Sequence, residues 1–506
     1  MGERVLDRVQ VAHLRHWDNL SRRQRHDWSL FNGKGAGEFD FGSTRFQLAF
    51  MMYGLALTHR HRLPAAPGLF APTMRRLMDQ LLMPDVWLYW RDLSKGGSPY
   101  NAHLMGGYEE QWDPVAQDNI QYSAYVQSGA NLHDYLFGED RYAEPGSLTF
   151  RYSSFYWGGE EQEFRYDRDS LNEHIYWLMV RSGYVGIACV PNCVFLFCNQ
   201  PAILGFRMHD LVTGGNRADE VVRSYKKVWE DFGILDEAGH YNLLRLEDSG
   251  RVVSGGPARA QSDGNKGALL NMWHRDFVHR HYRRQIGEYL ERSPGGNLQT
   301  KVIPDVVVPG LPTDVDNLDF GWMAAWASEM GDQQTLDGLF AHADSAMSPT
   351  YLDRGLYYPR NDTKSDGAGN NIEVAPFVGN VLLGYARLNV PDGLWGLYNV
   401  PWPDDRFTLP ALTSVARDIE VTQAENIDGV LRARVERIDS IVDLPSYRSI
   451  DDDPEPGTVT VGRLPDRCEV LVDGVGVSVD RDPGDGRNFT FTVPWGGPHR
   501  LEVVVR

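Results

Sequence analysis

The sequence predicts a mainly α protein, with an (α/α)6-type helical barrel followed by a small C-terminal β-sandwich. Up to about residue 407 the apolar residues repeat with helical spacing, and Gly-rich and Pro-rich connections separate the helices. Beyond Pro410 short alternating runs replace this pattern. A chain of 506 residues is also too long for one ordinary core. We therefore expect a barrel domain over 1–407 and a sandwich domain over 408–506.

Amphipathic stripes mark the helices of the first domain. The apolar residues from Met74 to Leu82 recur at i, i+3, i+4, i+7 and i+8 until Pro84, and 221–232 repeats this spacing. Further helices are expected at 43–60, 117–137, 170–182, 267–291, 319–330 and 334–343. Many helices with Gly-rich, aromatic connections suit a barrel with one set of helices inside and one outside. Trp322 lies on such a helical face and is expected in the core.

The strands of the second domain are expected where β-branched and alternating runs occur. These runs are 431–435, 458–461, 489–493 and 501–505. Turn signals such as Asp473-Gly474 bound them. Several short strands at this spacing are typical of a β-sandwich.

Charge and hydropathy exclude several classes of protein. The formal net charge of −19 argues against a nucleic-acid partner, because phosphate binding needs a basic stripe. No apolar stretch approaches the roughly 20 residues of a membrane span. The first residues lack a basic segment followed by an apolar run, so no signal peptide is predicted. We expect a cytoplasmic protein, or a periplasmic one if an export signal has been removed.

The cysteines are clustered. Of the 4 in the chain, Cys189, Cys193 and Cys198 lie close together and Cys468 is remote, which is not a disulfide framework for a chain of this size. Zinc is not indicated either, because no His or Cys partner lies at short range and no HExxH pattern occurs. We expect no metal and no cofactor.

The segment around the cysteines predicts a β-hairpin or a tight hairpin-like loop. Two apolar runs flank Pro191-Asn192, a turn signal. With an even number of loop residues, Cys189 and Cys198 lie on one face and Cys193 in the turn; with an odd number they point apart. Two thiols on one face could act as an acid–base pair. The alternative is that they pack as small buried hydrophobic residues.

Other polar residues have two interpretations each. Glu160, Glu161 and Glu163 could line a pocket, although a solvated loop is the plainer explanation. His209 and Asp210 could form a catalytic pair, although a hydrogen-bonded structural histidine is favoured.

Several multi-residue strings point to one family. They are ACVPNCVFLFCNQP at 188–201, GFRMHD at 205–210, RFQLA at 45–49, ALTHRHRLPAAPG at 56–68, DNIQYS at 118–123 and GYARLNVPDGLW at 384–395. In this order, over roughly residues 30–402, the sequence resembles the linalool dehydratase-isomerase family. The sandwich lies outside the resemblance.

The resemblance implies a fold and an activity. The fold is a toroid of paired inner and outer helices in a ring-shaped homo-oligomer, expected to be a pentamer. The activity is cofactor-free dehydration of a tertiary allylic alcohol to a diene, with isomerisation between tertiary and primary alcohols. Cys189 and Cys198 match the two family cysteines, and Asp40 best matches an aspartate that reaches the site from a neighbouring subunit. We expect Asp40 and Tyr125 on the hydroxyl side of the substrate, and the cysteines at its carbon.

The sequence departs from the family pattern at three positions. Phe46 replaces a tyrosine, Gln121 replaces a methionine and Tyr125 replaces a histidine. Within a helix over 117–137, Gln121 and Tyr125 share a face. We expect Phe46 and Phe195 to form apolar wall and Gln121 to orient the hydroxyl. The substrate is thus a small apolar alcohol, but linalool itself does not follow.

Two other functions remain open from the sequence. Helical toroids with an appended sandwich also suit polysaccharide lyases and hydrolases, which need paired carboxylates or Tyr/His bases. A carrier that binds small apolar molecules without chemistry is the third possibility. Thiol alkylation separates these functions, because only the cysteine enzyme should lose activity.

Overall fold

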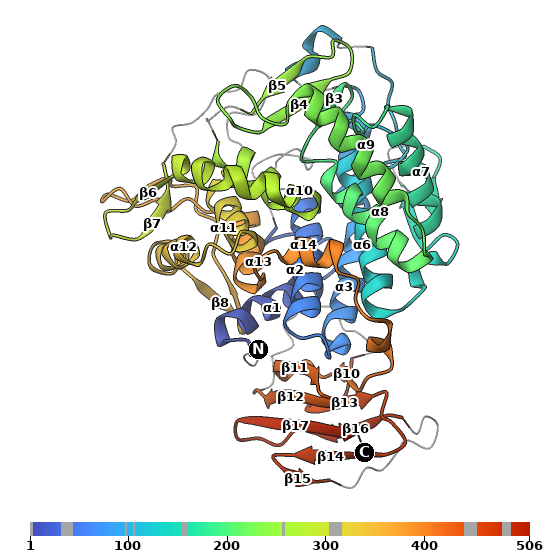
Figure 1. Cartoon of the computed structure of the whole chain (residues 1–506), viewed down its shortest axis with the longest axis vertical. Coiled ribbons are helices and arrows are strands. Elements are labelled where there is room, and N and C mark those ends of the chain that lie inside the picture. Colours follow the sequence, from blue (N-terminus) through green and yellow to red (C-terminus); the bar gives the residue numbers. More distant parts are fainter. Residues whose placement is uncertain are drawn as a thin grey trace.

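Helices dominate the chain as far as residue 407, and strands form the remainder (Figure 1). The structure is a computed structural model, and it describes residues 4–31, 44–96, 99–104, 107–153, 159–255, 259–302, 316–439, 453–477 and 487–505. The main helices are α1 (Arg8–Ser21), α2 (Thr44–His61), α3 (Pro67–Leu81), α6 (Ile120–Phe137), α7 (Arg168–Arg181), α8 (Gln200–Thr213), α9 (Arg217–Phe232), α10 (Ala260–Tyr289), α11 (Asp319–Glu329), α12 (Gln333–Ala346), α13 (Leu383–Leu388) and α14 (Gly393–Asn399). A short π-helix, Val378–Leu382, precedes α13.

The inner helices form a closed ring. Helix α2 contacts α6, α6 contacts α8, α8 contacts α10, α10 contacts α11, and α11 contacts α13, which returns to α2. Helices α3, α7, α9 and α12 each pack outside the ring on the helix that precedes them, and α1 packs on α13. Helix α10 is kinked at His274, and its second half is buried on one side only, like an outer helix. The predicted fold class is confirmed.

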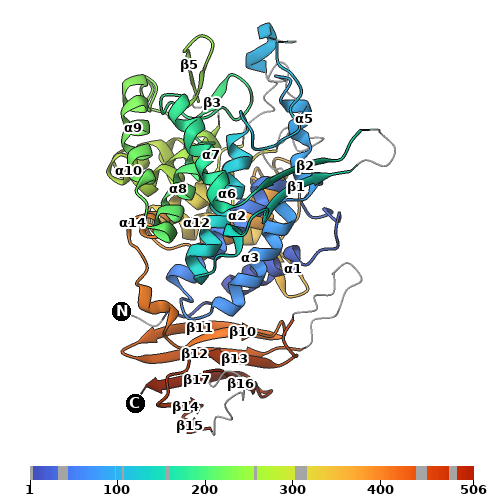
Figure 2. The same cartoon turned by 90° about the vertical axis from the view of Figure 1, so that its right-hand side faces the viewer.

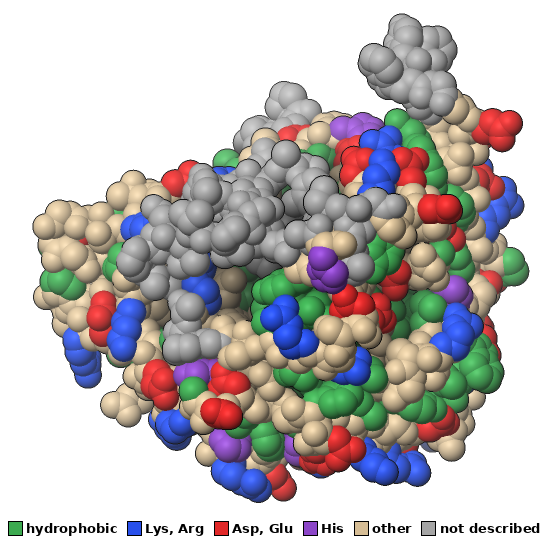
Figure 3. All heavy atoms as spheres, turned by 90° about the horizontal axis from the view of Figure 1, so that it is seen from above, with side chains coloured by type: hydrophobic (Ala, Val, Ile, Leu, Met, Phe, Trp, Pro, Cys, Tyr) green, Lys and Arg blue, Asp and Glu red, His purple; other side chains and the backbone are tan. Residues whose placement is uncertain are grey.

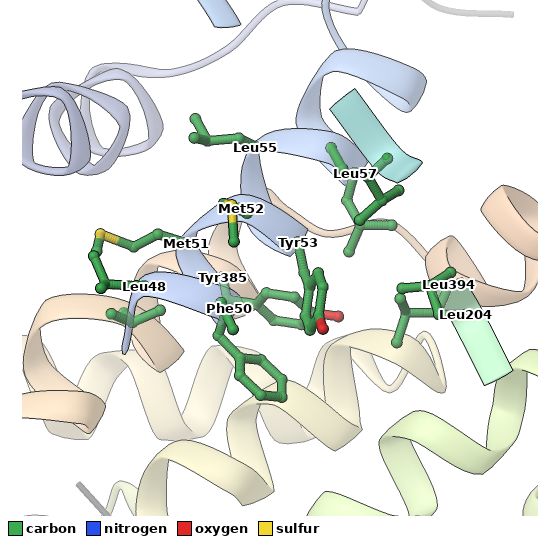
Figure 4. Close-up of a cluster of buried hydrophobic side chains, with 14 of the residues drawn as sticks. Leu48, Phe50, Met51, Met52, Tyr53, Leu55, Leu57, Leu204, Tyr385 and Leu394 are labelled. Atoms are coloured by element: carbon green, nitrogen blue, oxygen red, sulfur yellow. The ribbon is translucent and has the colours of Figure 1, made fainter. Parts of the chain in front are cut away.

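Burial explains which helices lie inside. Every residue of α6 is buried, and α2 is buried from Thr44 to His59. Side chains of α2 radiate to all sides, with Leu48 and Met51 on one side and Phe50 close to Tyr385 on another (Figure 4). Outer helix α9 instead fully buries only a stripe of Ala218, Val221, Tyr225 and Trp229, and its other residues are partly or fully exposed. A helix apolar all round belongs in a core, and a striped one belongs on its surface.

Glycines allow the inner helices to approach one another closely. A Cβ added to Gly267 of α10 would lie 2.5 Å from Nε1 and from Cζ2 of Trp326 in α11. A Cβ at Gly205 of α8 would lie 2.5 Å from Cδ of Gln127 in α6. Only glycine leaves room for these neighbours at such a separation.

Antiparallel strands form two sheets after the helices. The three-stranded sheet has the order β10-β13-β16, and the five-stranded sheet has the order β11-β12-β17-β14-β15. Their strands are β10 (Ala411–Val415), β11 (Ile419–Ile427), β12 (Val430–Arg437), β13 (Thr458–Gly462), β14 (Cys468–Val472), β15 (Val475–Gly476), β16 (Phe489–Thr492) and β17 (Pro498–Val505). Burial alternates along β12, where Leu431, Ala433 and Val435 face the core. This alternation matches the sandwich pattern in the sequence.

The sheets pack beneath α1 and α3 (Figures 1 and 2). Asp18 of α1 is central to this junction: Arg22 Nε lies 2.9 Å away and Arg76 Nη2 of α3 lies 2.6 Å away. Arg22 also pairs with Asp453, at 2.6 Å. Neighbouring arginines, Arg22 first, hold the pKa of Asp18 well below its usual range against the effect of burial. Ion pairs therefore join the two parts of the chain.

The helices predicted from the sequence are all present with modest changes of boundary. The sequence analysis did not predict the inner helices α8 and α13 or the outer helix α1, which complete the ring and its outer layer. Among the helices that the structure describes, none combines the length and hydrophobicity of a membrane span. On the face opposite the sheets, the side chains that Figure 3 shows intersperse acidic and basic groups among hydrophobic ones.

Candidate active site

The cysteine segment folds differently from the predicted hairpin. Val190 and Cys193 form a single bridge around a turn in which Asn192 has a φ of 70°. The strand that follows, β3 (Cys193–Phe195), pairs with β4 (Asn242–Leu246) and not with the preceding run. The segment thus forms the tight hairpin-like loop, closed by hydrogen bonds from Cys189 N to Cys193 O and from Cys193 N to Val190 O, both at 2.9 Å. The two apolar runs do not pair further as a hairpin, and Cys193, expected in the turn, begins a strand. Residues near 244 take the place of the predicted partner strand, which local periodicity could not reveal.

A single asparagine brings the two ends of this segment together. Asn199 Oδ1 accepts a hydrogen bond from Ile187 N at 2.8 Å, and Asn199 Nδ2 donates to the carbonyls of Ile187 and Phe195, both at 3.0 Å. Because Ile187 and Phe195 are fixed to one side chain, Cys189 and Cys198 come to lie side by side. The cysteines meet as predicted, but through this clamp.

The two thiols hydrogen-bond to each other and have different surroundings. Cys189 is half-buried, whereas Cys198 is 5% exposed. The hydrogen bond from Cys198 lowers the pKa of the Cys189 thiol. Burial, followed by the interaction with Cys189, raises the pKa of Cys198 well above its ordinary value. Cys189 is therefore the more acidic thiol, and Cys198 is the one that keeps its proton.

Gln121 and Tyr125 extend the pair along α6. In its thiol form Cys189 donates to Gln121 Oε1 at 3.5 Å, and Gln121 Nε2 donates to Tyr125 OH at 3.2 Å. The two α6 residues share a face one turn apart, as predicted. Burial raises the pKa of Tyr125 well above its ordinary value, so its hydroxyl stays protonated and can donate a hydrogen bond.

A buried arginine that the sequence analysis did not single out lies beside these groups. The Cζ atom of Arg45, in the first turn of α2, is 4.8 Å from the centroid of the Phe46 ring and 4.1 Å from that of Tyr89. Its positive charge lowers the pKa of both thiols, as a smaller influence than the hydrogen bond at Cys189 and the burial at Cys198. Arg45 belongs to the string RFQLA, which supports the family resemblance. The neighbouring sequence contains nothing that assigns this arginine to a site.

Aromatic rings enclose the polar groups. The Phe46 ring lies 5.9 Å from that of Tyr125, edge to face, and 6.1 Å from that of Phe377. Trp322 lies 6.0 Å from Phe377 and 5.6 Å from Phe197, the neighbour of Cys198. The sequence analysis did not assign Phe377, Trp322 or Phe197 to the aromatic wall of the site, because these residues come from three separate segments.

The remaining predicted residues lie elsewhere. Phe195 lies opposite Leu244 in the β3–β4 pair and packs against Cys193 and its neighbours, so its place in the wall stays a prediction. Asp40 lies outside the described residues.

The contacts of Glu163, His209 and Asp210 agree with the plainer interpretation of these polar residues. Glu163 pairs with Arg151 and Arg165 on an exposed hairpin of β1 (Leu148–Tyr152) and β2 (Gln162–Tyr166), which projects from the helices in Figure 2. His209 Nε2 lies 2.9 Å from Asp169, and Asp210 accepts the amide of Ala218 in the first turn of α9 at 2.7 Å.

Two further features of the described part of the chain lie away from the cysteines. A cavity of about 520 Å³ lies between α1, α3 and the sheets, and one of about 270 Å³ lies between α12 and α13. Neither has the two cysteines in its lining. Within the described residues, no group of three or more His, Cys, Asp and Glu side chains could hold a metal ion.

Comparison with known families decides the relationship. The model of the linalool dehydratase/isomerase family matches residues 45–364, more than half of the chain. The chain belongs to the linalool dehydratase/isomerase family. The match includes Phe46, Gln121, Tyr125 and both cysteines of the thiol pair, and it ends before the sheets. Membership in this dehydratase/isomerase family suggests hydro-lyase or isomerase activity, and the family resemblance in the sequence is confirmed.

Three of the solved structures that this chain matches are glycan enzymes. An alpha-1,6-mannanase from Salegentibacter sp. is 13% identical, with a TM-score of 0.42, over 75% of this chain and 99% of that chain. An alpha-amylase from Clostridium perfringens is 9% identical, with a TM-score of 0.39, over 76% and 98%. An endoglucanase from Clostridium thermocellum is 8% identical, with a TM-score of 0.33, over 99% and 92%. Likeness at this level says nothing about what this member of the dehydratase/isomerase family does.

Proposed function

We propose that the protein dehydrates and isomerises small allylic or terpenoid alcohols without a cofactor, with Cys189 as base and Cys198 as acid. The observation that carries the proposal is the mutual hydrogen bond of the two thiols, which lowers the pKa of Cys189 while burial raises that of Cys198. Environments that push two neighbouring pKa values apart are how acid and base roles are assigned. Family membership supplies the reaction class.

The pair can complete a dehydration without a net change in the protein. The Cys198 thiol gives its proton to the departing hydroxyl, the C–O bond breaks, and water leaves with the bonding electrons. The Cys189 thiolate then removes a proton from the neighbouring carbon, and the electrons of that C–H bond form the new double bond. Finally the proton on Cys189 returns to the Cys198 thiolate through their hydrogen bond. Isomerisation follows when water adds back at the other end of the allylic cation.

The surrounding residues suit a cationic intermediate. The rings of Phe46, Tyr125, Phe377 and Trp322 present π-electron density, and each ring contact with a cation is worth roughly 0.5–2 kcal/mol. Tyr125 keeps its proton and can donate to the substrate hydroxyl. Arg45 opposes the build-up of positive charge, but it lies over the rings of Phe46 and Tyr89, which partly offset its field.

Several parts of the proposal rest on the family alone. They are the contribution of Asp40 from a neighbouring subunit, the ring-shaped homo-oligomer with five subunits as the expected number, and the absence of a cofactor. The replacements at Phe46, Gln121 and Tyr125 favour an alcohol other than linalool. We therefore propose the class of tertiary and primary allylic alcohols from about C5 to C15.

The experiment is product analysis with matched cysteine variants. Purified protein is incubated with a panel of C5 to C15 allylic alcohols, and dienes and isomeric alcohols are measured by gas chromatography. Cys189→Ala and Cys198→Ala should each lower the rate by about 10²–10⁴. The double variant should be little worse than either single variant, because the pair acts as a unit. Full activity in either single variant refutes the proposed roles.

A control comes from the same loop. Cys193→Ala alters a buried thiol in the small cluster with Leu244 and Leu246, and it should retain activity. If no alcohol is turned over but one binds saturably, the carrier function is favoured. Turnover of a glycan that survives thiol alkylation favours a polysaccharide enzyme.

A further inference from the structure

Lys266 is a fully buried lysine that the mechanism above does not use. It lies in the inner half of α10 with an exposed fraction of 0%. Its Nζ donates to the carbonyl oxygen of Ser262 at 2.5 Å and to Ser262 Oγ at 3.0 Å. Lysine is almost never fully buried unless it is paired, because an ammonium ion loses much hydration energy in the interior. Two of its three donors are used by Ser262, one turn earlier in the same helix.

The face of α10 that carries Lys266 is turned toward the thiol pair. Trp273 lies two helical turns after Lys266 on the same face, and its Nε1 donates to Gln200 Oε1 at 2.8 Å. Gln200 is the first residue of α8 and follows Cys198 by two positions.

Contacts with α11 fix the level of Lys266 along α10. Gly264, half a turn earlier, lies against Trp322, since an added Cβ would be 3.1 Å from Trp322 Cβ. Trp322 in turn touches Phe197, the residue that precedes Cys198, with ring centroids 5.6 Å apart. At this position the charge of Lys266 favours the thiolate form of Cys198.

A hydrogen-bonded carboxylate lies on the other side of the lysine. Asp263 interacts electrostatically with Lys266. Its oxygens lie 2.7 Å from His240 Nδ1 and 2.8 Å from the Tyr289 hydroxyl, and accept the Tyr241 amide at 2.9 Å. This anchored negative charge favours the ammonium form of Lys266, against burial, which lowers the pKa of Lys266 to about 8. A charged lysine in the interior is thus kept near neutral pH.

We propose that Lys266 is a positioning residue of the acid–base pair, and that its ammonium group stabilises the Cys198 thiolate formed when Cys198 gives up its proton. This inference rests on the proposed function for its place in a reaction. When the S–H bond of Cys198 breaks, the proton goes to the substrate oxygen and the electron pair stays on sulfur. Lys266 keeps all three of its protons. The thiolate persists until Cys189 returns a proton to it, and Lys266 then faces a neutral thiol again.

Other charged and titratable groups share this surrounding. Those that interact with Cys198 are Cys189, Arg45 of α2, Tyr125 of α6, Tyr225 of α9 and Lys266 of α10. The two tyrosines are buried and neutral, and burial raises the pKa of each. In a Cys189→Ala background, Arg45 and Lys266 are therefore the cations that govern the titration of Cys198.

The test measures the thiolate form of Cys198 while Lys266 is charged. In a Cys189→Ala background, the rate of iodoacetamide modification of Cys198 is measured by peptide mass spectrometry from about pH 6 to about pH 7.5, below the pKa of Lys266. Lys266→Met removes the charge and keeps the length of the side chain, and Lys266→Gln is a second neutral variant. Loss of the charge should raise the pKa of Cys198 by about one unit or more, so that modification at a fixed pH near 7 slows by about tenfold.

Two controls separate charge from structure. Lys266→Arg keeps the charge, and Ser262→Ala keeps the ammonium group while removing one hydrogen bond, so both should titrate like the parent. Folding of each variant is checked by circular dichroism. An unchanged modification rate near pH 7 in either folded neutral variant overturns the inference. So does an equal slowing in Ser262→Ala, which indicates that packing alone is responsible.

Failure of the inference and failure of the proposed function can be told apart. The modification needs no substrate, so a slower rate in the neutral variants supports the role of Lys266 even if no alcohol is converted. Turnover that depends on the cysteines, together with an unchanged modification rate, supports the function and overturns the role of Lys266.

Discussion

Replacing Gly267 by alanine tests how closely α10 and α11 approach in the ring. The added Cβ would lie 2.5 Å from Trp326 Nε1 and from Trp326 Cζ2, whereas carbon atoms at ordinary contact are about 3.5–4.0 Å apart. The shortfall is therefore about 1 Å or more. The indole cannot easily retreat, because it is fully buried and lies edge to face against Tyr282 with centroids 4.9 Å apart.

The magnitude follows from two opposing contributions. Alanine in place of glycine within a helix stabilises the fold by about 1 kcal/mol. Overpacking in a core costs about 1–3 kcal/mol, and a clash with a ring that is held on its far side belongs at the upper end. We expect Gly267→Ala to lower the free energy of unfolding by about 2 kcal/mol.

Gly287 provides a control in the same helix. A Cβ at Gly287 meets nothing within 4 Å among the described residues, so Gly287→Ala should show the helical gain alone, about 1 kcal/mol. The assay is the midpoint of thermal unfolding followed by circular dichroism. The midpoint temperature should be highest for Gly287→Ala, intermediate for the parent protein and lowest for Gly267→Ala.

A double variant identifies the cause. Trp326→Phe removes the indole atoms that clash, and it sacrifices no hydrogen bond, since Trp326 Nε1 has no partner among the described residues. In this background Gly267→Ala should become neutral or stabilising, which corresponds to a coupling of about 2–3 kcal/mol. If Gly267→Ala stabilises the parent protein as much as Gly287→Ala does, α10 and α11 are not as close as described.

Three further predictions concern charge. Cys198→Ala removes the hydrogen bond that lowers the pKa of Cys189. The pKa of Cys189, measured as the midpoint of its alkylation rate against pH, should therefore rise by about one to two units. An unchanged midpoint contradicts this. Burial holds the pKa of Lys266 at about 8 instead of 10.5, which disfavours the ammonium form in the folded state. At pH 7 the charged lysine should therefore lower the free energy of unfolding of the parent protein by up to about 3 kcal/mol relative to Lys266→Met. This deficit should shrink as the pH rises from 8 to 10.5. If the free energies of unfolding of the two proteins change in parallel with pH, the argument is refuted. Asp18→Asn leaves buried arginines without their carboxylate, so it should lower the free energy of unfolding by about 3 kcal/mol or more at neutral pH, measured by thermal or denaturant unfolding. Asp140→Asn is the control: its side chain is 82% exposed, and the substitution should lower the free energy of unfolding by less than about 1 kcal/mol.

Sequence patterns located the outer helices α3, α7, α9 and α12 and the inner helices α2, α6, α10 and α11. The stripe of α9 is visible because one face is polar. Helices α8 and α13 were missed, because most of their residues are buried, no stripe distinguishes them, and they are shorter than the buried helices α2 and α6. Helix α1 was missed for a different reason. It buries polar side chains such as His13, Arg15 and His16, which a hydropathy pattern assigns to the protein surface. Both cases follow from tertiary packing, which periodicity does not record.

The candidate site was also predicted only in part. The resemblance identified Gln121, Tyr125 and the two cysteines, and the structure brings these four together. The tight loop at Pro191-Asn192 was predicted correctly, but the extended hairpin was not, because the partner of β3 is a strand that begins at Asn242. Other site groups come from distant segments. The cation Arg45 is on α2, Lys266 is on α10, and the aromatic wall is drawn from α11 and the segment before the π-helix. No local spacing joins such segments.

The closure of the ring between α2 and α13 has a consequence for how the protein is made. These helices lie more than 300 positions apart, yet Phe46 and Phe377 touch across the junction, with centroids 6.1 Å apart. A contact of such long range forms late in folding, because the entropy of closing the loop must be overcome first. During translation α2 leaves the ribosome long before its last neighbour exists, with apolar side chains on every side. Nascent chains that stop short of α13 should accordingly be prone to aggregation and dependent on chaperones.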